Sequence, residues 1–375
     1  MRIMLIGPVY PYKSGISDYT GALYRQLCKK HEMKVYSYSM QYPKFMYKKE
    51  QKNYEDDTVK IDDVEYILNS ANPFNWMKVA KRIKKENPEL LIMQWVHPYF
   101  APCYWFMTRQ WKKIPLLYIC HNALPHERFP LDRWLTKITL SHAKYIVAHS
   151  NSDLEILREM LPKAKIAMNP HPAYNFFKIK DMSKEEGRNL LGLKQDAKVL
   201  LFFGLVREYK GLKHLLNAMP AIKQKYGDVK LLIAGEFGSA ENKKLYMDML
   251  ENLQIADCVE VHDGYIPIPE VEKFFAACDM VVLPYESATQ SGVIQVAYSF
   301  DKTVLATNVG GLPDVVQNMQ TGYIVEPRNP QKIAESVIDF YENNREQYFE
   351  KYIQEEAYRF SWDRMEETIK ALIKE

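Results

Sequence analysis

The stretch FFGLVREYKG (residues 202–211) decides the fold. It completes an apolar run, KVLLFFG, that stops at a glycine, and it carries Arg207 and Lys210 in the turn that follows. Gly211 then opens a segment with apolar residues at helical spacing, namely Leu212, Leu215, Leu216 and Met219. This order predicts a phosphate-binding βα unit, because backbone N–H groups and the helix dipole add to the side-chain charge. An ordinary βα turn with solvated Arg and Lys side chains is the alternative.

A second stretch of the same design is LPYESATQSGVIQVAYSFDKTVLATNVGGLPDVV (residues 283–316). An apolar strand again ends in a loop, and a helix is predicted from about Gly292. A short strand, TVLAT, and a Gly310-Gly311 pair follow. The segment after the first strand of the chain, GPVYPYKSGISDYT, is a third such loop, although it lacks a GxGxxG pattern. Open α/β sheets bind ligands at loops of this kind, outside the carboxyl ends of the strands.

Strands and helices alternate along the whole chain. The predicted strands of the first half lie in RIMLIGPV, KVYSYSM, VEYIL, LLIMQWV, IPLLYIC, AKYIVAHS and KIAMNPHP. Those of the second half lie in KVLLFFG, VKLLIAG, CVEVHDG, MVVLPY, TVLAT and GYIVEP. Such continuous apolar runs are typical of strands buried on both faces of a parallel sheet. We therefore expect an α/β protein built from two doubly wound, Rossmann-like domains.

The 375 residues suit two domains. The proline-containing segment PHPAYNFFKIKDM (residues 170–182) is the predicted linker. It divides the chain into an N-terminal domain over residues 1–175 and a C-terminal domain over residues 176–359. The tail (residues 356–375) is predicted to form an amphipathic helix.

Composition limits the classes of function. A hydrophobic content of 47% with 26% charged residues indicates a soluble globular protein, and five cysteines without a CxxC spacing indicate a reducing compartment. No signal peptide is predicted. The apolar run at residues 90–107 contains Gln94, His97 and two prolines, so it predicts a buried strand and a loop and not a membrane span.

Charge is distributed unevenly, with a net +10 over residues 1–170 and −7 over the remainder, which together give +3. Aromatic residues accompany the basic runs of the first half; the runs are Lys44, Lys48, Lys49, Lys52, Lys78, Lys81, Arg82, Lys84 and Lys85, and the aromatic residues are Tyr42, Phe45, Tyr47, Trp76 and Trp111. This combination suits a surface that touches anionic lipid, and a solvated lysine-rich helix face is the alternative. Nucleic acid is not an expected partner, because no recognition motif is present and the second half is acidic.

The two opening stretches, in this order, resemble the C-terminal domain of the GT-B glycosyltransferases of family GT4, the retaining "group 1" transferases, and the resemblance covers nearly the whole chain. It implies two Rossmann-like domains that face each other across a cleft, with the acceptor on the N-terminal domain and the nucleotide sugar on the C-terminal domain. A C-terminal helix, about residues 360–375, would pack back on the N-terminal domain.

The resemblance implies retaining transfer of a hexose from a UDP- or GDP-linked sugar to a hydroxyl group, without a metal or other cofactor. A saccharide or a lipid-linked glycan of cell-surface polysaccharide or glycoconjugate synthesis is the expected acceptor. The expected location is cytoplasmic, with peripheral contact at the inner face of the plasma membrane.

The family motifs give expected donor-site residues. Lys210 matches the lysine of Gly-Arg-x4-Lys-Gly, whereas Leu205 occupies the arginine position and Arg207 lies two residues later; the two cations would stabilise the leaving diphosphate. In the family, a glycine of the first loop faces the diphosphate, a histidine after the fifth apolar run lines the sugar site, and backbone groups hold the base. The matching residues are Gly15, His121, Tyr265 and Ile266. The helix start formed by Gln290, Ser291, Gly292 and Val293 would offer N–H groups to a phosphate.

The chain departs from the family at the Glu-x7-Glu pair, whose positions are occupied by Ala288 and Val296. This departure puts the ribose contact in doubt, and Glu286 or Gln295 is a candidate substitute. Two alternatives follow: a non-catalytic nucleotide-sugar-binding GT-B subunit, and, less favoured because no carboxylate pair is evident, a nucleotide-sugar epimerase.

Histidines also raise the question of a metal site. His121, His126 and Glu127 share the loop CHNALPHE, and His97 follows another strand. No HExxH motif and no cysteine partner accompanies them, so this spacing predicts no zinc site.

Overall fold

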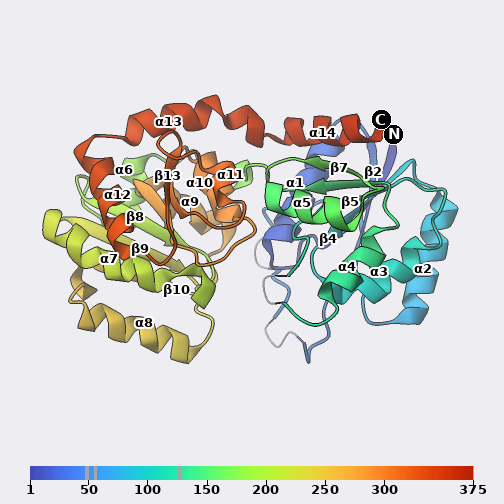
Figure 1. Cartoon of the computed structure of the whole chain (residues 1–375), viewed down its shortest axis with the longest axis horizontal. Coiled ribbons are helices and arrows are strands. Elements are labelled where there is room, and N and C mark those ends of the chain that lie inside the picture. The colour runs from blue at the N-terminus through green and yellow to red at the C-terminus, as the bar shows by residue number, and fades with distance from the viewer. Residues whose placement is uncertain (47–49, 55–56, 126–127, 375) are drawn as a thin grey trace. The chain divides into compact units, whose positions relative to one another are not determined.

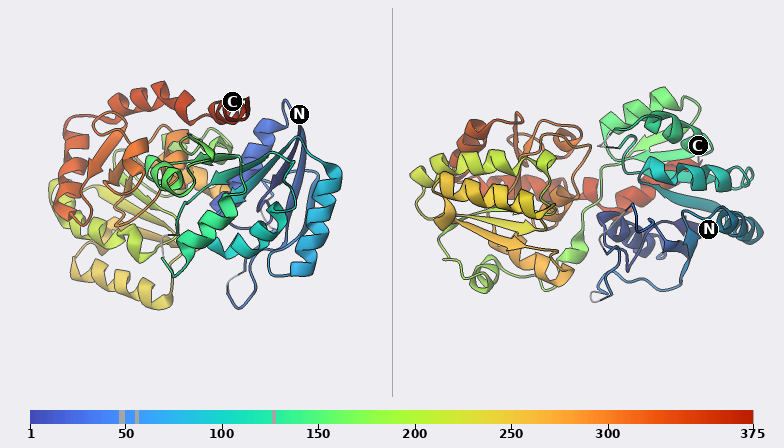
Figure 2. Two further views of the ribbon diagram at one scale, coloured as in Figure 1. Left: turned by 45° about the vertical axis from the view of Figure 1, so that its right-hand side comes forward. Right: turned by 90° about the horizontal axis from the view of Figure 1, so that it is seen from below.

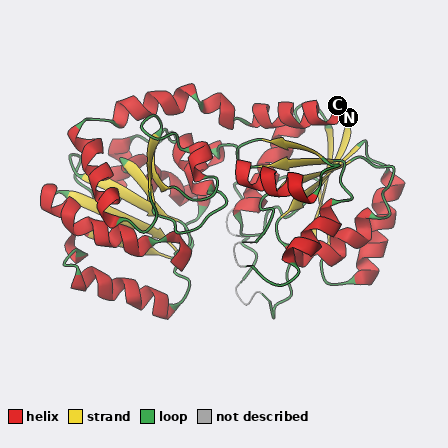
Figure 3. Cartoon of the chain, viewed as in Figure 1, coloured by secondary structure: helices red, strands yellow, loops and turns green. Residues whose placement is uncertain are grey.

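The structure is a computed structural model that describes residues 1–46, 50–54, 57–125 and 128–374. The chain forms two compact units: unit 1 comprises Met1–His171 and Ser361–Glu375, and unit 2 comprises Pro172–Phe360. The boundary lies between His171 and Pro172, within the predicted linker, and not after residue 175. Each unit is a parallel sheet with flanking helices (Figures 1 and 3).

Unit 1 contains a seven-stranded sheet in the order β3-β2-β1-β4-β5-β6-β7, and every pairing is parallel. Its strands are β1 (Arg2–Ile6), β2 (Glu32–Met40), β3 (Val64–Asn69), β4 (Leu90–Trp95), β5 (Leu116–Cys120), β6 (Tyr145–Ala148) and β7 (Lys165–Met168). Its helices are α1 (Gly15–Leu27), α2 (Pro73–Glu86), α3 (Ala101–Thr108), α4 (Asp132–Leu140), α5 (Asn151–Met160) and α14 (Trp362–Lys374).

Unit 2 contains a six-stranded parallel sheet in the order β10-β9-β8-β11-β12-β13. Its strands are β8 (Lys198–Phe203), β9 (Val229–Gly235), β10 (Val259–Asp263), β11 (Met280–Leu283), β12 (Thr303–Thr307) and β13 (Gly322–Val325). Its helices are α6 (Lys184–Leu190), α7 (Leu212–Lys225), α8 (Ala240–Asn252), α9 (Ile268–Ala277), α10 (Gly292–Ser299), α11 (Leu312–Val315), α12 (Pro330–Glu342) and α13 (Glu346–Glu355).

The apolar runs of the inner strands, such as β4, β5, β8 and β12, are buried on both faces of their sheets, as predicted, whereas the edge strands β3, β7 and β10 are only partly buried. In β8, Leu200 and Phe202 join a core with Leu215 of α7. Val199 and Leu201, which point to the opposite face because successive side chains alternate, are also fully buried. Helices cover both faces of the unit 2 sheet (Figure 2). The sequence prediction of doubly wound α/β architecture is therefore confirmed.

The C-terminal helix α14 packs on α1 within unit 1 (Figure 1). The Gln26 amide of α1 donates hydrogen bonds of 2.8 Å to both Asp363 and Glu366. Burial opposes ionisation of Glu366, but hydrogen bonds from neighbours that include Gln26 outweigh it and lower its pKa to about 2. The helix starts at Trp362 and not at residue 356, because the Ser361 hydroxyl caps it by accepting the Arg364 N–H at 3.0 Å.

Each sheet has a point where the strand order reverses. In unit 1 it lies between β1 and β4, and in unit 2 it lies between β8 and β11. Connections leave such a pair of strands in opposite directions, which opens a crevice outside their carboxyl ends. The loops that the sequence singled out after β1, β8 and β11 all begin at these two places.

The described part of the chain contains no helix with the length and apolar character that crossing a bilayer requires. Two of the aromatic residues expected on a lipid-facing surface are held inward. Trp111 is 3% exposed and donates its indole N–H to the Ala80 carbonyl at 3.0 Å, and Trp76 donates to the Asn69 carbonyl at 2.8 Å. Tyr47, Lys48 and Lys49 lie outside the described residues.

Candidate functional site

The first candidate site lies at the carboxyl end of β8 in unit 2. Gly204, which follows the strand, has a φ of +97°. A Cβ atom added there would lie 3.2 Å from Lys210 Nζ and 3.7 Å from Val293 Cγ2. Both atoms therefore approach one point, so the structure brings the Lys210 ammonium to the first turn of α10.

The loops after β8 and β11 are packed against each other. Gly211 has a φ of +65°, and a Cβ atom there would lie 2.0 Å from the Pro284 carbonyl oxygen. The Glu286 N–H donates to the Tyr209 carbonyl at 2.7 Å. Only glycine meets both demands at position 211 without strain. The cationic turn and the start of α10 are thus held together at the point where the strand order reverses.

Lys210 and Arg207 supply the positive charge of this site. Burial lowers the pKa of Lys210, and the Arg207 charge lowers it further. The Lys210 ammonium lies 5.5 Å from the centre of the Tyr285 ring. Among the residues that the structure describes, neither Lys210 nor Arg207 forms an ion pair with a carboxylate. Two cations, one of them desolvated, are thus available to an anion.

The N-terminus of α10 adds backbone donors. Ser291 is the N-cap residue, yet its side chain does not cap the helix and lies 3.3 Å from the Tyr285 hydroxyl. The first-turn N–H groups of a helix have no intrahelical partner, so Gly292 and Val293 present donors there. Gln290 is half-buried in the same loop. Of the predicted group formed by Gln290, Ser291, Gly292 and Val293, the structure brings Val293 close to Lys210.

The Gly310-Gly311 pair packs against the backbone of the loop that precedes α10. Gly310 has a φ of +52°, and a Cβ atom there would lie 1.7 Å from the Ala288 carbonyl oxygen. The Gly311 N–H donates to the Thr289 carbonyl at 2.8 Å. The second glycine-containing stretch therefore positions the loop that precedes α10.

Glu286 is fully engaged by neighbouring side chains. Its carboxylate accepts from Lys213 and His214 at 2.9 Å each and from Arg328 at 2.7 Å. Burial raises its pKa, but these three donors prevail and lower the pKa to about 2. The carboxylate anchors the two loops, which leaves it poorly placed to replace a missing ribose ligand. Gln295, the other candidate, is 1% exposed, and its amide atoms have no hydrogen-bond partner in the described part of the chain.

Tyr265 and Ile266 follow β10, at the edge of the unit 2 sheet. Tyr265 is 48% exposed, whereas Ile266 is half-buried. β10 is separated from β8 by β9, which corresponds to about 10 Å between strand axes. The structure therefore places both residues at the same edge of the sheet as Lys210 but further along it.

In unit 1, Gly15 begins α1, directly after the N-cap residue Ser14. No atom lies within 4 Å of a Cβ atom added at Gly15, and its φ lies outside the left-handed region. Neither local packing nor backbone conformation requires a glycine here.

His121 follows β5 and is almost completely buried, at 2% exposed. Its backbone N–H donates to the Trp95 carbonyl at 3.0 Å, and its Nε2 lies 2.7 Å from Gln94 Oε1. Burial, together with His149 and His171, holds the pKa of His121 well below its ordinary value. His126 and Glu127 lie outside the described residues.

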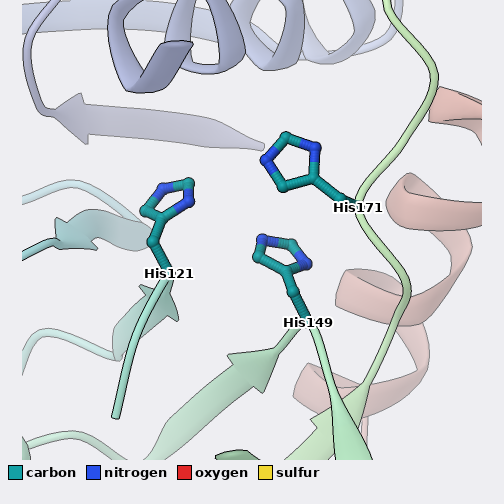
Figure 4. Close-up of side chains that lie close together, drawn as sticks. All are labelled: His121, His149 and His171. Carbon is teal, nitrogen blue, oxygen red and sulfur yellow. The ribbon is translucent and has the colours of Figure 1, made fainter. Parts of the chain in front are cut away.

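His121 belongs to a cluster that the sequence reasoning missed. His149 follows β6 and His171 follows β7, and the three ring centres lie 4.9–6.1 Å apart (Figure 4). One ring nitrogen from each histidine lies within 4.8 Å of the other two. Zinc motifs are recognised by histidines close together in the chain, and these three are far apart. The signal that could have revealed them is that predicted strands such as AKYIVAHS and KIAMNPHP each carry a histidine near the end.

Comparison with known proteins assigns both units. Residues 13–172 match the model described as "Glycosyltransferase Family 4", and residues 183–359 match "Glycosyl transferases group 1". A D-inositol 3-phosphate glycosyltransferase of Paenarthrobacter aurescens (strain TC1) is 27% identical over 207 residues, which cover 55% of this chain and 48% of that protein. The chain thus spans about half the length of the curated relatives it matches.

Solved structures show the same fold. Anabaena Alr3699/HepE in complex with UDP superposes with a TM-score of 0.78 at 16% identity, over 100% of both chains. The complex of the same protein with UDP-glucose gives 0.77 at 17% identity, over 100% of this chain and 99% of that one. The two parallel-sheet domains have the GT-B fold, and the two family models together span nearly all of both, so this chain belongs to the group 1 glycosyltransferases of family GT4.

Proposed function

We propose that this protein is a retaining glycosyltransferase that moves a hexose from a nucleoside-diphosphate sugar to a hydroxyl group. The observation that carries the proposal is the Lys210 ammonium, which is desolvated, has no carboxylate partner in the described structure and lies at the first turn of α10. Burying a charge without a counterion costs free energy. A diphosphate offers the missing negative charge and also suits the α10 N-terminus.

In the proposed reaction, the bond between the sugar C1 and a diphosphate oxygen breaks, and a bond from C1 to the acceptor oxygen forms on the same face. The departing diphosphate oxygen takes the acceptor proton. Because the new bond forms on the face that the diphosphate leaves, the configuration at C1 is retained. Lys210, Arg207 and the N–H groups of Gly292 and Val293 would stabilise the charge that develops on the diphosphate. Because these groups supply the positive charge, the proposed step requires no metal ion. The donor-facing roles of Gly15 and His121 rest on the family resemblance and stay predictions.

The donor is proposed to be a UDP-linked sugar, with a GDP-linked sugar as the alternative. Anabaena Alr3699/HepE, which shares the fold, has been crystallised with UDP and with UDP-glucose. Tyr265 and Ile266 are the proposed base-binding residues, since they lie at the same sheet edge as Lys210. A thermal-shift screen of UDP, GDP, ADP and their sugar conjugates tests this, because a ligand at 100 times its Kd stabilises the folded state by about 2.7 kcal/mol. Stabilisation by none of these nucleotides would refute the donor site.

A non-catalytic nucleotide-sugar-binding protein is the second candidate, and the engagement of Glu286 favours it. No carboxylate stands at the positions of the family's Glu-x7-Glu pair, since these are Ala288 and Val296. Release of free UDP from UDP-sugar in the presence of hydroxyl acceptors separates the two candidates. Nucleotide binding without UDP release or sugar transfer, across lipid-linked and free saccharide acceptors, would support the binding protein. Conversion of the donor sugar to its epimer in the absence of acceptor would instead indicate an epimerase.

We also propose that the acceptor is lipid-linked and that α2 contacts an anionic, inner-face membrane surface. The helix carries Lys78, Lys81 and Lys85, and its Phe74 is 81% exposed and its Met77 40% exposed. Cationic side chains beside exposed apolar ones suit the surface of an anionic bilayer. The fraction of protein that sediments with phosphatidylserine vesicles should fall as the salt concentration rises, and it should be smaller for Phe74→Ser than for the wild type. Equal sedimentation with neutral vesicles, or none at low salt, would contradict this part of the proposal.

A further inference from the structure

Three buried histidines converge in unit 1 because of sheet topology. β5, β6 and β7 are adjacent and parallel, with Cys120 paired to Ala148 and Ala148 paired to Met168. His121 and His149 each directly follow a strand in this register, and His171 lies in the loop after β7. Carboxyl ends of parallel neighbours meet at one edge of the sheet. The three side chains are 2%, 2% and 7% exposed.

Hydrogen bonds orient two of these rings. His149 Nδ1 lies 2.8 Å from the Asn169 carbonyl oxygen, which only accepts, so Nδ1 carries the proton and Nε2 carries the lone pair. His149 Nε2 is buried and has no hydrogen-bond partner in the described structure. His121 Nε2 faces Gln94 Oε1 at 2.7 Å, an arrangement that leaves the lone pair on Nδ1. Metal-ligating histidines usually hold their second ring nitrogen in this way.

We propose that His121, His149 and His171 form a binding site for one divalent transition-metal ion with the preferences of Zn²⁺. Each histidine offers one ring nitrogen, and these nitrogens lie within 4.8 Å of one another. Three imidazoles with a fourth position open form a well-known zinc donor set, and neutral imidazole is the binding form. Nitrogen donors without a carboxylate exclude Mg²⁺ and Ca²⁺ as preferred ions, because these prefer oxygen.

The geometry requires only a small adjustment. Tetrahedral ligands about 2.0–2.1 Å from zinc lie about 3.3 Å from each other, so the widest nitrogen pair must close by about 1.5 Å. Rotation of side chains such as His171, which stands on a loop, can supply this movement (Figure 4). The competing explanation is an aromatic cluster centred on Tyr19, whose ring packs edge-on against all three imidazoles at 4.8–5.3 Å. Such a cluster explains ring packing, but it gives no partner to the buried His149 Nε2.

The proposed site shares His121 with the predicted donor site, but its test measures metal binding alone and does not depend on sugar transfer. The test uses the purified full chain, stripped with a chelator and then titrated with Zn²⁺ against a chromophoric chelator. A parallel titration with Co²⁺ reports geometry through its visible d–d bands. We expect one ion per chain and a thermal shift with Zn²⁺ but not with Mg²⁺. Absence of Zn²⁺ binding by the wild-type chain would overturn the proposal.

His149→Phe separates the two explanations, because it keeps an aromatic ring beside Tyr19 and removes the ligand atom. Zn²⁺ affinity should fall by more than about 100-fold, whereas the matched control His142→Phe, in the same unit but outside the cluster, should stay within about twofold. If His149→Phe does not fold, Gln94→Met provides the second variant. By releasing the His121 ring it should weaken binding about 10- to 100-fold and alter the Co²⁺ bands. Zn²⁺ binding that is equal in wild type and in whichever of these variants folds would refute the site.

Discussion

Replacing Lys210 by methionine should weaken nucleotide binding without destabilising the protein. Methionine keeps the apolar stem of lysine and removes the ammonium that lies over Gly204 and beside Val293. A hydrogen bond to a charged group contributes about 1.5–3 kcal/mol, and 1.4 kcal/mol corresponds to a tenfold change in affinity. The Kd for UDP should therefore rise about 10- to 150-fold in Lys210→Met.

Lys210→Met should weaken UDP binding but should not lower the stability of the ligand-free protein. Because burial lowers the pKa of Lys210, its charged form costs free energy in the folded state, and Lys210→Met removes that cost. The melting temperature of the ligand-free variant should equal or exceed that of the wild type. Below the lowered pKa the cost is fully present. As pH rises through that pKa towards the ordinary value near 10.4, the wild type should gain stability relative to the variant.

Lys213→Met is the matched control, since Lys213 lies in the first turn of α7, three residues after Lys210, but pairs with Glu286 at 2.9 Å. Its partly exposed ion pair contributes at most about 1 kcal/mol, so this variant should lose a little stability and keep its UDP affinity within about twofold. Isothermal titration calorimetry with UDP measures the Kd of both variants, and thermal melting measures their stability. The reasoning is refuted if Lys210→Met binds UDP as well as Lys213→Met does, or if it melts well below the wild type.

Three further substitutions test the same region and the first loop. Glu286→Gln should lower the free energy of unfolding by about 1–2 kcal/mol at pH 7; because the folded-state pKa is about 2, denaturant titrations should show this difference vanish as pH falls from about 4.3 towards 2. Gly211→Ala should cost more than about 1 kcal/mol by the same titrations, owing to its φ of +65° and the contact with Pro284. Gly15→Ala should leave stability unchanged or raise it by up to about 1 kcal/mol, yet it should reduce UDP-sugar turnover if the donor approaches α1 closely.

Strand positions were predictable from the sequence because burial on both faces leaves continuous apolar runs. Each predicted run overlaps a strand of the structure, from β1 to β13. Helix ends were less predictable, since they depend on single capping residues. The C-terminal helix illustrates this: it was predicted from residue 356, whereas it starts at Trp362, where the Ser361 hydroxyl caps it.

The cationic part of the candidate site was also predictable, because Arg207 and Lys210 lie in the loop after one predicted strand and the start of α10 ends the loop after another. The state of Glu286 was not. Its carboxylate meets Lys213 and His214 from α7 and Arg328 from the loop after β13, and no sequence pattern relates these positions. Whether a carboxylate is free for a ligand depends on contacts between loops, which only the folded chain shows.

The histidine cluster could not be found from motifs within one segment of the chain, because its three residues follow three different strands. Zinc motifs such as HExxH work because one helix or loop supplies neighbouring ligands. A parallel sheet offers a second route, since residues that follow adjacent strands meet at its edge however far apart they lie in the chain. His121, His149 and His171 follow β5, β6 and β7 in this way. Metal-ligand searches in doubly wound proteins should therefore compare the residues after each predicted strand with one another. This rule is informative only when strand order is known, because β6 must lie between β5 and β7 for the three rings to meet.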